Sequence, residues 1–290
     1  MPPDAVSYAL ALPRLPGLGR VATHRLLDAF PTFDALRATP REQVIHRLTG
    51  IPGAAALAAT LFDDDAVGAA LAAVADERAV LAARGITAIT PNVPAWPAGL
   101  DRLDRRDRPA ALYVYGRADL LARPSVAFLG ATGLPPDAFE YAQALLPALA
   151  RRGIVPVGAL ASGFDVVVGK VAGGAGVPAV MVAGCGLGVV PPPMRPLAMQ
   201  TAQAGGALVS PFERGHGPFA HDEADRARVM AALATHAVVF GGEGGGPEHR
   251  ALALPFALAH PSVTGADPAR LLTGDRDRDA DRLAAPGIDP

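Results

Sequence analysis

The chain has a single cysteine, a single lysine and few aromatic residues, which make up 5% of its 290 positions. One cysteine, Cys185, excludes a disulfide framework and a zinc site built from several cysteines. Lysine and arginine together number 26 against 28 acidic residues, for a net charge of -2. This balance excludes a uniformly basic nucleic-acid-binding surface, so any such site must be a local patch.

The sequence also lacks a long uninterrupted apolar run. The longest, residues 177–190, is broken by Pro178 and by glycines and is too short to span a bilayer. No basic region precedes an apolar stretch at the amino terminus, so we expect no signal peptide and a cytoplasmic protein. Hydrophobic residues nevertheless make up 50% of the chain, which favours a large buried core.

Three segments of the chain differ in pattern. Residues 1–85 are predicted to form short helices and then one long alanine-rich helix over 66–84, which Gly85 ends. Residues 86–265 begin with a short strand and a proline-rich connection, and then alternate strands with helices. Residues 266–290 alternate Asp with Arg and are expected to form a flexible charged tail. These three ranges are the predicted domains.

The strands expected in the second segment are apolar throughout, which is typical of a parallel sheet with helices on both faces. The sequence therefore predicts the α/β class. Ligands of such sheets bind beyond the carboxyl ends of the strands, at the loops that begin at Gly130, Gly158, Gly184 and Gly241. The predicted strands are 126–129, 154–157, 179–183, 207–209 and 237–240, and the predicted helices are 139–149, 165–172, 194–204, 224–234 and 248–259.

Several glycine-rich turns are candidate phosphate sites. Neither 129–133 nor 184–188 completes the Gly-x-Gly-x-x-Gly pattern of dinucleotide-binding loops, because prolines follow where that pattern needs a glycine or a helix. The run 241–248 carries five glycines, which favours close approach of a phosphate. Gly17 and Gly19, which precede a helix, fit either a helix-hairpin-helix that contacts DNA or a tight turn between two helices.

No residues form a pattern typical of a hydrolytic triad or a metal site. Ser162 does not lie in a nucleophile elbow. The histidines of the last third, including His216 and His221, lack metal-ligand spacing and are interpreted as surface residues. We therefore expect no metal and no cofactor. Glu243 and Glu248 leave open an acid/base pair beside a bound nucleotide.

Positive charge in or just after the predicted loops comes from five candidates for contacts with nucleic-acid phosphates, which are Lys170, Arg195, Arg226, Arg228 and Arg250. Acidic residues lie beside Arg226 and Arg228 and weaken any local positive field there. The alternative is that these arginines pair with those acids on a helix surface.

Five segments in a fixed order make the sequence similar to the DNA-processing protein A family (DprA, also called Smf). The resemblance covers residues 8–265. The shared order is far more specific than any one segment. The segments are 9–30, which is similar to the family's SAM-like opening, then 94–116, then 123–130, which is similar to the pattern RPxVAIVGSR, and finally 182–193 and 206–210.

The resemblance implies an extended Rossmann-like domain, preceded by a small all-α domain of the SAM or helix-hairpin-helix kind. It further implies no catalysis, single-stranded DNA in a positive pocket, a homodimer, protection of incoming DNA, and loading of the RecA recombinase in natural transformation. Carried over to this chain, the DNA-binding residues are Gly130, Thr132, Gly163, Lys170, Arg226 and Arg228.

The departures from the family fall on that pocket. Thr132 and Ser162 stand where the family has arginines, whereas Lys170 keeps a basic position. Two missing cations predict weaker salt-dependent binding and mark a diverged member or paralogue.

The loop 240–248 is also similar to that of the related LOG enzymes, which cleave nucleoside monophosphates at the N-glycosidic bond. In this alternative Glu248 is the catalytic carboxylate and Arg228 or Arg226 its partner, although the threonine of that loop is missing. A non-catalytic nucleotide-binding protein with the same fold is a third interpretation.

Overall fold

The structure is a computed structural model that describes residues 3–130, 134–161, 164, 166–241, 254 and 256–285. The chain divides into two compact units. The first comprises Met1–Trp96 and Leu103–Tyr113, and the second comprises Pro97–Arg102 and Val114–Pro290. No helix among the described residues is both long and apolar enough to cross a membrane.

The first unit is mainly helical. Its longest element is the predicted alanine-rich helix, which ends before Gly85 (φ +68°), a backbone conformation that glycine adopts without strain. Leucines that are fully buried, such as Leu26 and Leu48, form its core. The elements are α1 (Ala5–Ala11), η1 (Leu12–Arg14), α2 (Arg20–Ala29), α3 (Phe33–Arg37), α4 (Arg41–Arg47), α5 (Ala54–Leu61), α6 (Asp64–Ala83), β1 (Ile86–Ile89) and the start of β2 (Leu112–Gly116).

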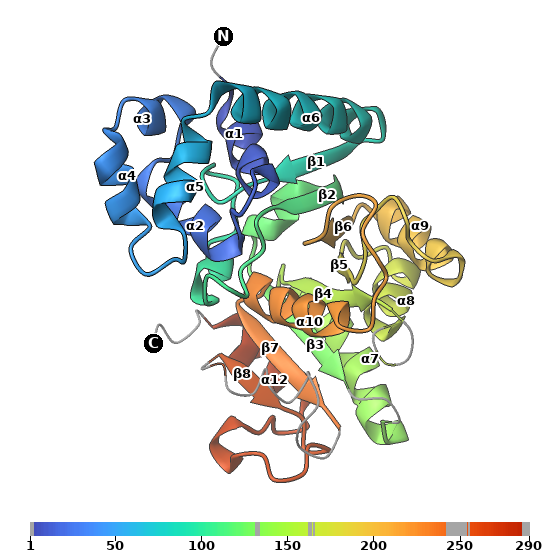
Figure 1. Ribbon diagram of the computed structural model, residues 1–290. Coiled ribbons are helices and arrows are strands. Elements are labelled where there is room, and N and C mark those ends of the chain that lie inside the picture. The colour runs from blue at the N-terminus through green and yellow to red at the C-terminus, as the bar shows by residue number, and fades with distance from the viewer. Residues whose placement is uncertain are drawn as a thin grey trace. The chain divides into compact units, whose positions relative to one another are not determined.

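The second unit is built on a mostly parallel sheet in the order β2-β6-β5-β4-β3-β7-β8 (Figure 1). Neighbours from β6 to β8 pair in parallel, and in the central pair Val126 lies opposite His236 and Gly130 opposite Phe240. All five predicted strands are confirmed. The strands are β3 (Ser125–Gly130), β4 (Val155–Leu160), β5 (Val180–Ala183), β6 (Ala207–Ser210), β7 (His236–Phe240) and β8 (Ala257–Ala259).

Helices cover both faces of this sheet, as the apolar strands predict. One buried cluster joins Val126 and Phe128 of β3 to side chains of α7, α8, α9 and α12. Successive strand residues point to opposite faces, so Ala127 and Leu129 face the other side, where α10 packs on β3, β4 and β5. The helices are η2 (Ala98–Arg102), η3 (Ala118–Ala122), α7 (Pro136–Arg151), α8 (Val166–Gly174), η5 (Pro192–Met194), α9 (Arg195–Gln203), α10 (Asp222–Leu233), η7 (Pro268–Arg270) and α12 (Arg276–Ala284).

Arg102 ties η2 to the carboxyl end of α10. Its guanidinium donates to the carbonyl oxygens of Ala232 (3.0 Å) and Ala234 (2.8 Å) and lies 3.9 Å from the ring centre of Phe256. Carbonyls at a helix carboxyl end lack intrahelical donors and carry partial negative charge, so a cation there is stabilising.

The helix predicted over 248–259 is wrong at its end, because Ala257–Ala259 form strand β8 beside β7. A short apolar run does not distinguish a buried helix from a buried strand. In this case pairing with the exposed edge of β7 satisfies the backbone of 257–259. Most of the remaining residues of that predicted helix lie outside the described part of the chain.

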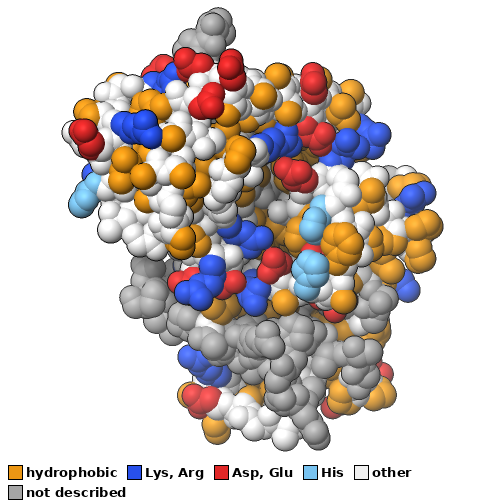
Figure 2. Space-filling model, viewed as in Figure 1, with side chains coloured by type: hydrophobic (Ala, Val, Ile, Leu, Met, Phe, Trp, Pro, Cys, Tyr) orange, Lys and Arg blue, Asp and Glu red, His pale blue; other side chains and the backbone are white. Residues whose placement is uncertain are grey.

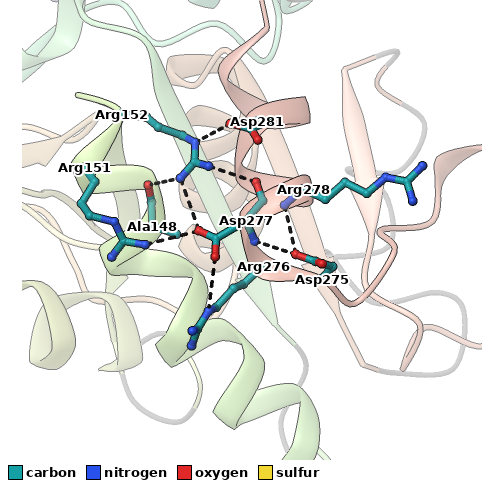
Figure 3. A network of polar contacts seen from close by, with 8 residues as sticks. All are labelled: Ala148, Arg151, Arg152, Asp275, Arg276, Asp277, Arg278 and Asp281. Carbon is teal, nitrogen blue, oxygen red and sulfur yellow. Dashed lines mark hydrogen bonds and ion pairs between the residues drawn. The ribbon is translucent and has the colours of Figure 1, made fainter.

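In place of the expected flexible tail, the chain forms α12, which packs on α7. Arg152 donates to Asp281 (2.7 Å) and to the carbonyl of Asp277 (3.1 Å), and Arg151 donates to the Asp277 carboxylate (3.3 Å; Figure 3). The alternating charges of this segment therefore have partners on α7 that lie more than 100 positions away in the sequence.

The buried side chain of Asp279 links α12 to α7 and to the residues that precede α12. Its carboxylate is fully buried and accepts hydrogen bonds from Tyr141 Oη (2.6 Å), from the backbone and hydroxyl of Thr273 (both 2.9 Å) and from Gly274 N (3.0 Å). Burial, together with the hydrogen bond to Asp279, raises the pKa of Tyr141, so the phenol remains a donor.

Replacing Asp279 with alanine leaves four donors without this acceptor, and we expect the free energy of unfolding to fall by about 3–5 kcal/mol. The free energy of unfolding is measured by urea denaturation, with circular dichroism as the signal. Asp281→Ala is the matched control on the same helix, because its 72% exposed carboxylate forms only a surface pair and its loss changes stability far less. Equal midpoints for the two variants would contradict the role assigned to Asp279.

Candidate functional site

The strand order of the second unit reverses between β3 and β7. Chain connections run away from this position on both sides, and in open parallel sheets ligands bind beyond the carboxyl ends of the strands at such a position. Gly130 ends β3 and Phe240 ends β7, side by side. The sites predicted at Thr132, Gly163 and Glu248 belong to the neighbouring loops but lie outside the described residues.

Aromatic side chains pack against one another at the carboxyl ends of β3 and β7. Phe164 and Phe240 lie with ring centres 5.0 Å apart, and Phe128 stacks on Phe240 at 5.8 Å. A Cβ added to Gly130 would lie 1.9 Å from the Phe164 ring. The missing side chain of Gly130 therefore makes room for Phe164, a packing role that the sequence analysis did not foresee.

The start of the glycine-rich run is anchored to the segment after β8. Gly241 N donates to Ser262 Oγ (2.9 Å), which lies 2.8 Å from His260 Nδ1. Ser262 N also donates to Nδ1 (3.2 Å), so this nitrogen is an acceptor in the neutral ring. Burial lowers the pKa of His260, and the carboxylates of Asp137 and Asp279 offset part of the shift.

Lys170 lies at the same edge of the sheet. It is exposed on α8 and lines a hollow of about 310 Å³ together with Ala161, which directly follows β4, and Pro193, which follows β5. The other residues around the hollow are Val166, Met194, Pro196, Leu197 and Gln200. A single flexible ammonium group at a mostly apolar hollow is suited to a phosphate of an extended ligand.

The two predicted arginines of α10 differ from each other. Arg226 is 8% exposed, and its Cδ lies 3.6 Å from the position of a Cβ on Gly184. Arg228 donates to Asp225 at 2.7 Å. The alternative in which the arginine pairs with an acidic residue of its own helix is thus confirmed for Arg228, whatever the partner of Arg226. On the face in Figure 2, the basic side chains drawn in colour are interspersed with acidic ones.

The glycines of 184–188 pack against the loop that follows β6. Gly186 N donates to His216 O (2.8 Å) and Gly188 N to Arg214 O (3.0 Å). A Cβ on Gly186 would lie 2.0 Å from the backbone oxygen of Glu213. This close approach of two loops accounts for Gly186 without any nucleotide.

The loop after β6 also carries a cluster that the sequence analysis did not recognise. Phe212 stacks on His216 (ring centres 4.6 Å apart) and Phe219 stacks on His221 (5.6 Å). Both imidazoles face Asp222, which is 1% exposed at the start of α10. The spacing of these residues in the sequence does not predict the cluster. They come together because a sharp turn at Gly217 (φ +70°) brings the loop back to the Asp222 carboxylate.

In the first unit, Gly17 and Gly19 are both exposed ahead of α2. Gly17 has φ +79°, and Gly19 is the residue that precedes the first turn of the helix. Nothing lies within 4 Å of a Cβ added to Gly19. The sequence-based prediction that these glycines contact DNA stays a prediction.

Comparison with known proteins identifies relatives of this fold. The family described as DNA recombination-mediator protein A matches residues 87–246. No curated protein matches the chain. The structure is similar to DNA processing protein A (DprA) of Streptococcus pneumoniae, with a TM-score of 0.68 and 19% identity over 98% of this chain and 93% of that chain.

A second similar structure is DNA processing protein A of Helicobacter pylori, whose study concerns a single-stranded DNA binding mode of that protein. The TM-score is 0.53 at 22% identity, over 63% of this chain and 83% of that chain. At these identities the two likenesses show the fold, and they confirm the predicted α/β class.

Gly186→Ala is expected to force the loops after β5 and β6 apart and to lower the free energy of unfolding by about 2–4 kcal/mol. Gly215→Ala, in the same loop region, is the control because nothing lies within 4 Å of its Cβ. Denaturant titration compares the two. Indistinguishable stabilities would show that the close approach of these loops is not required.

Acidification is expected to destabilise the second unit. Burial lowers the pKa of both His260 and His236 below the ordinary 6.5, so the unfolded state binds more protons as the pH falls. Their contribution to stability is complete above pH 6.5 and is lost below it, by at most about 1.4 kcal/mol per pH unit for each histidine. Urea unfolding between pH 7.5 and 5.5 measures this slope. His260→Gln is expected to flatten it, and an unchanged slope in that variant would refute the assignment.

Proposed function

The chain belongs to the DNA recombination-mediator protein A family, and from that membership we propose that it binds single-stranded DNA and loads RecA recombinase onto it. Binding takes place along the carboxyl edge of the sheet in the second unit. By the same reasoning the protein acts as a homodimer in the cytoplasm and protects incoming DNA during natural transformation.

The observation that carries this proposal is the position of Lys170. The only lysine of the chain is exposed at a hollow beyond the carboxyl end of β4, inside the range that matches the family. Parallel sheets bind their ligands at this edge. Single-stranded DNA needs cations to neutralise its phosphates and small residues that let its backbone come close to the protein. The likeness to the H. pylori protein supports the same ligand class.

The chain has fewer cations at this edge than the family pattern. Arg228 is held by Asp225, and Thr132 and Ser162 replace two family arginines. Each phosphate contact to a single strand contributes about 0.7 to the slope of log affinity against log salt concentration. We therefore expect weak salt dependence, with Lys170 providing a large share of it.

A catalytic role is not part of the proposal. The family consists of recombination mediators rather than enzymes. Arg228, one of the two arginines that the nucleotide-hydrolysis alternative could use, pairs with Asp225, and Glu248 lies outside the described residues. No observation on the described residues favours hydrolysis.

Lys170→Gln is expected to weaken binding to a fluorescent oligo-dT strand about three- to tenfold at low salt and to reduce the salt slope by about 0.7. Fluorescence anisotropy at several salt concentrations measures both. Arg123→Gln is the matched control, because it removes one positive charge from an exposed residue just before β3, at the opposite edge of the sheet.

Wild-type protein that does not bind the strand would refute the proposal. Equal losses in the two variants would refute the assignment to the carboxyl edge, since they would reflect net charge alone. The RecA step is tested with the same two variants, by comparing how fast RecA filaments nucleate on single strands coated with single-stranded-DNA-binding protein.

A further inference from the structure

Three metal-ligating side chains converge in the loop between β6 and α10. His216 Nε2 lies 3.0 Å and His221 Nε2 lies 3.4 Å from the same oxygen of Asp222, Oδ1. All three ligand atoms lie within 4.8 Å of one another. They come from a stretch of seven residues, so one loop brings them together.

These distances match the spacing of ligands around a zinc ion. Zinc binds imidazole nitrogen and carboxylate oxygen at about 2.0–2.2 Å in a tetrahedron, which places neighbouring ligand atoms about 3.3 Å apart. Two imidazoles and one carboxylate suit a divalent transition-metal ion better than magnesium or calcium, which prefer oxygen ligands.

The surroundings hold each ligand in place. The second Asp222 oxygen, Oδ2, accepts from Phe219 N (2.9 Å), which directs Oδ1 towards the histidines. A Cβ on Gly217 would lie 2.7 Å from Oδ2, so glycine permits the turn. The rings of Phe212 and Phe219 lie within 5° of parallel to their imidazoles and restrict ring rotation. Such supporting contacts are characteristic of metal sites.

The burial of Asp222 supplies the driving force. A carboxylate that is 1% exposed requires positive charge or several donors nearby. Two neutral imidazoles can both donate a hydrogen bond to Asp222 Oδ1 only if each carries its proton on Nε2. With the protons on Nδ1 instead, both Nε2 atoms and Oδ1 are acceptors close enough to one another to ligate a single cation.

We propose that His216, His221 and Asp222 bind one divalent transition-metal ion of the zinc class. The His221 side chain is 77% exposed, so water completes the coordination on the solvent side. The bound ion cross-links the loop to the start of α10 and adds positive charge beyond the carboxyl end of β6. This inference does not rest on the proposed DNA binding.

The test uses the untagged full chain, stripped with a chelator and titrated with zinc in a calorimeter, and with cobalt(II) followed by visible absorption. We expect one ion per chain at micromolar metal, cobalt bands typical of four- or five-coordinate sites, and a higher unfolding temperature with zinc. His221→Ala is expected to lose at least about tenfold in affinity, because it removes one of three ligands, and far-ultraviolet circular dichroism without metal checks that the variant is folded.

His46→Ala is the control, since His46 is an exposed histidine of the first unit. Its zinc affinity is expected to equal that of the wild type. The proposal is overturned if neither metal binds stoichiometrically at micromolar concentration, or if His221→Ala binds as tightly as His46→Ala. Either result would leave the cluster as a hydrogen-bonded support for Asp222.

Discussion

Burial of strands β3 to β7 on both faces is the constraint that organises the second unit. Every position of these strands is buried, so neither face of the sheet offers room for a ligand or a charged side chain. Polar chemistry is therefore confined to the loops at the strand ends. The reversal of strand order between β3 and β7 then selects the carboxyl edge, where Gly130 and Phe240 end side by side.

Arginine serves mainly as a structural donor in the described part of the chain. Arg102 binds the carboxyl end of α10, Arg152 holds α12 on α7, and Arg228 pairs with Asp225. The planar guanidinium suits these roles because it makes several directed hydrogen bonds at once. These arginines are less available to a polyanion, in a chain that has a single lysine and a net charge of -2.

The glycines at the carboxyl edge show how two possible roles, packing and close approach of a ligand, give the same sequence pattern. Gly130 and Gly186 are required by Phe164 and by the backbone of Glu213, respectively. Glycine at a strand end therefore indicates that another group comes close to the backbone, and the structure identifies that group as Phe164 at Gly130 and the Glu213 backbone at Gly186.

The sequence by itself determined the α/β class, the five strands β3 to β7, the long helix α6 and the family, because apolar runs, helix-ending glycines and the order of motifs are local or collinear properties. Tertiary structure decided the rest. The alternating charges of 275–279 predict a flexible tail, but the structure pairs Asp277 of this segment, and Asp281 after it, with Arg151 and Arg152 of α7. Strand β8 forms because the edge of β7 is available for pairing. The His216–His221–Asp222 group arose in the same way: its spacing is unremarkable along the chain, and only the turn at Gly217 and the buried start of α10 bring the three side chains together.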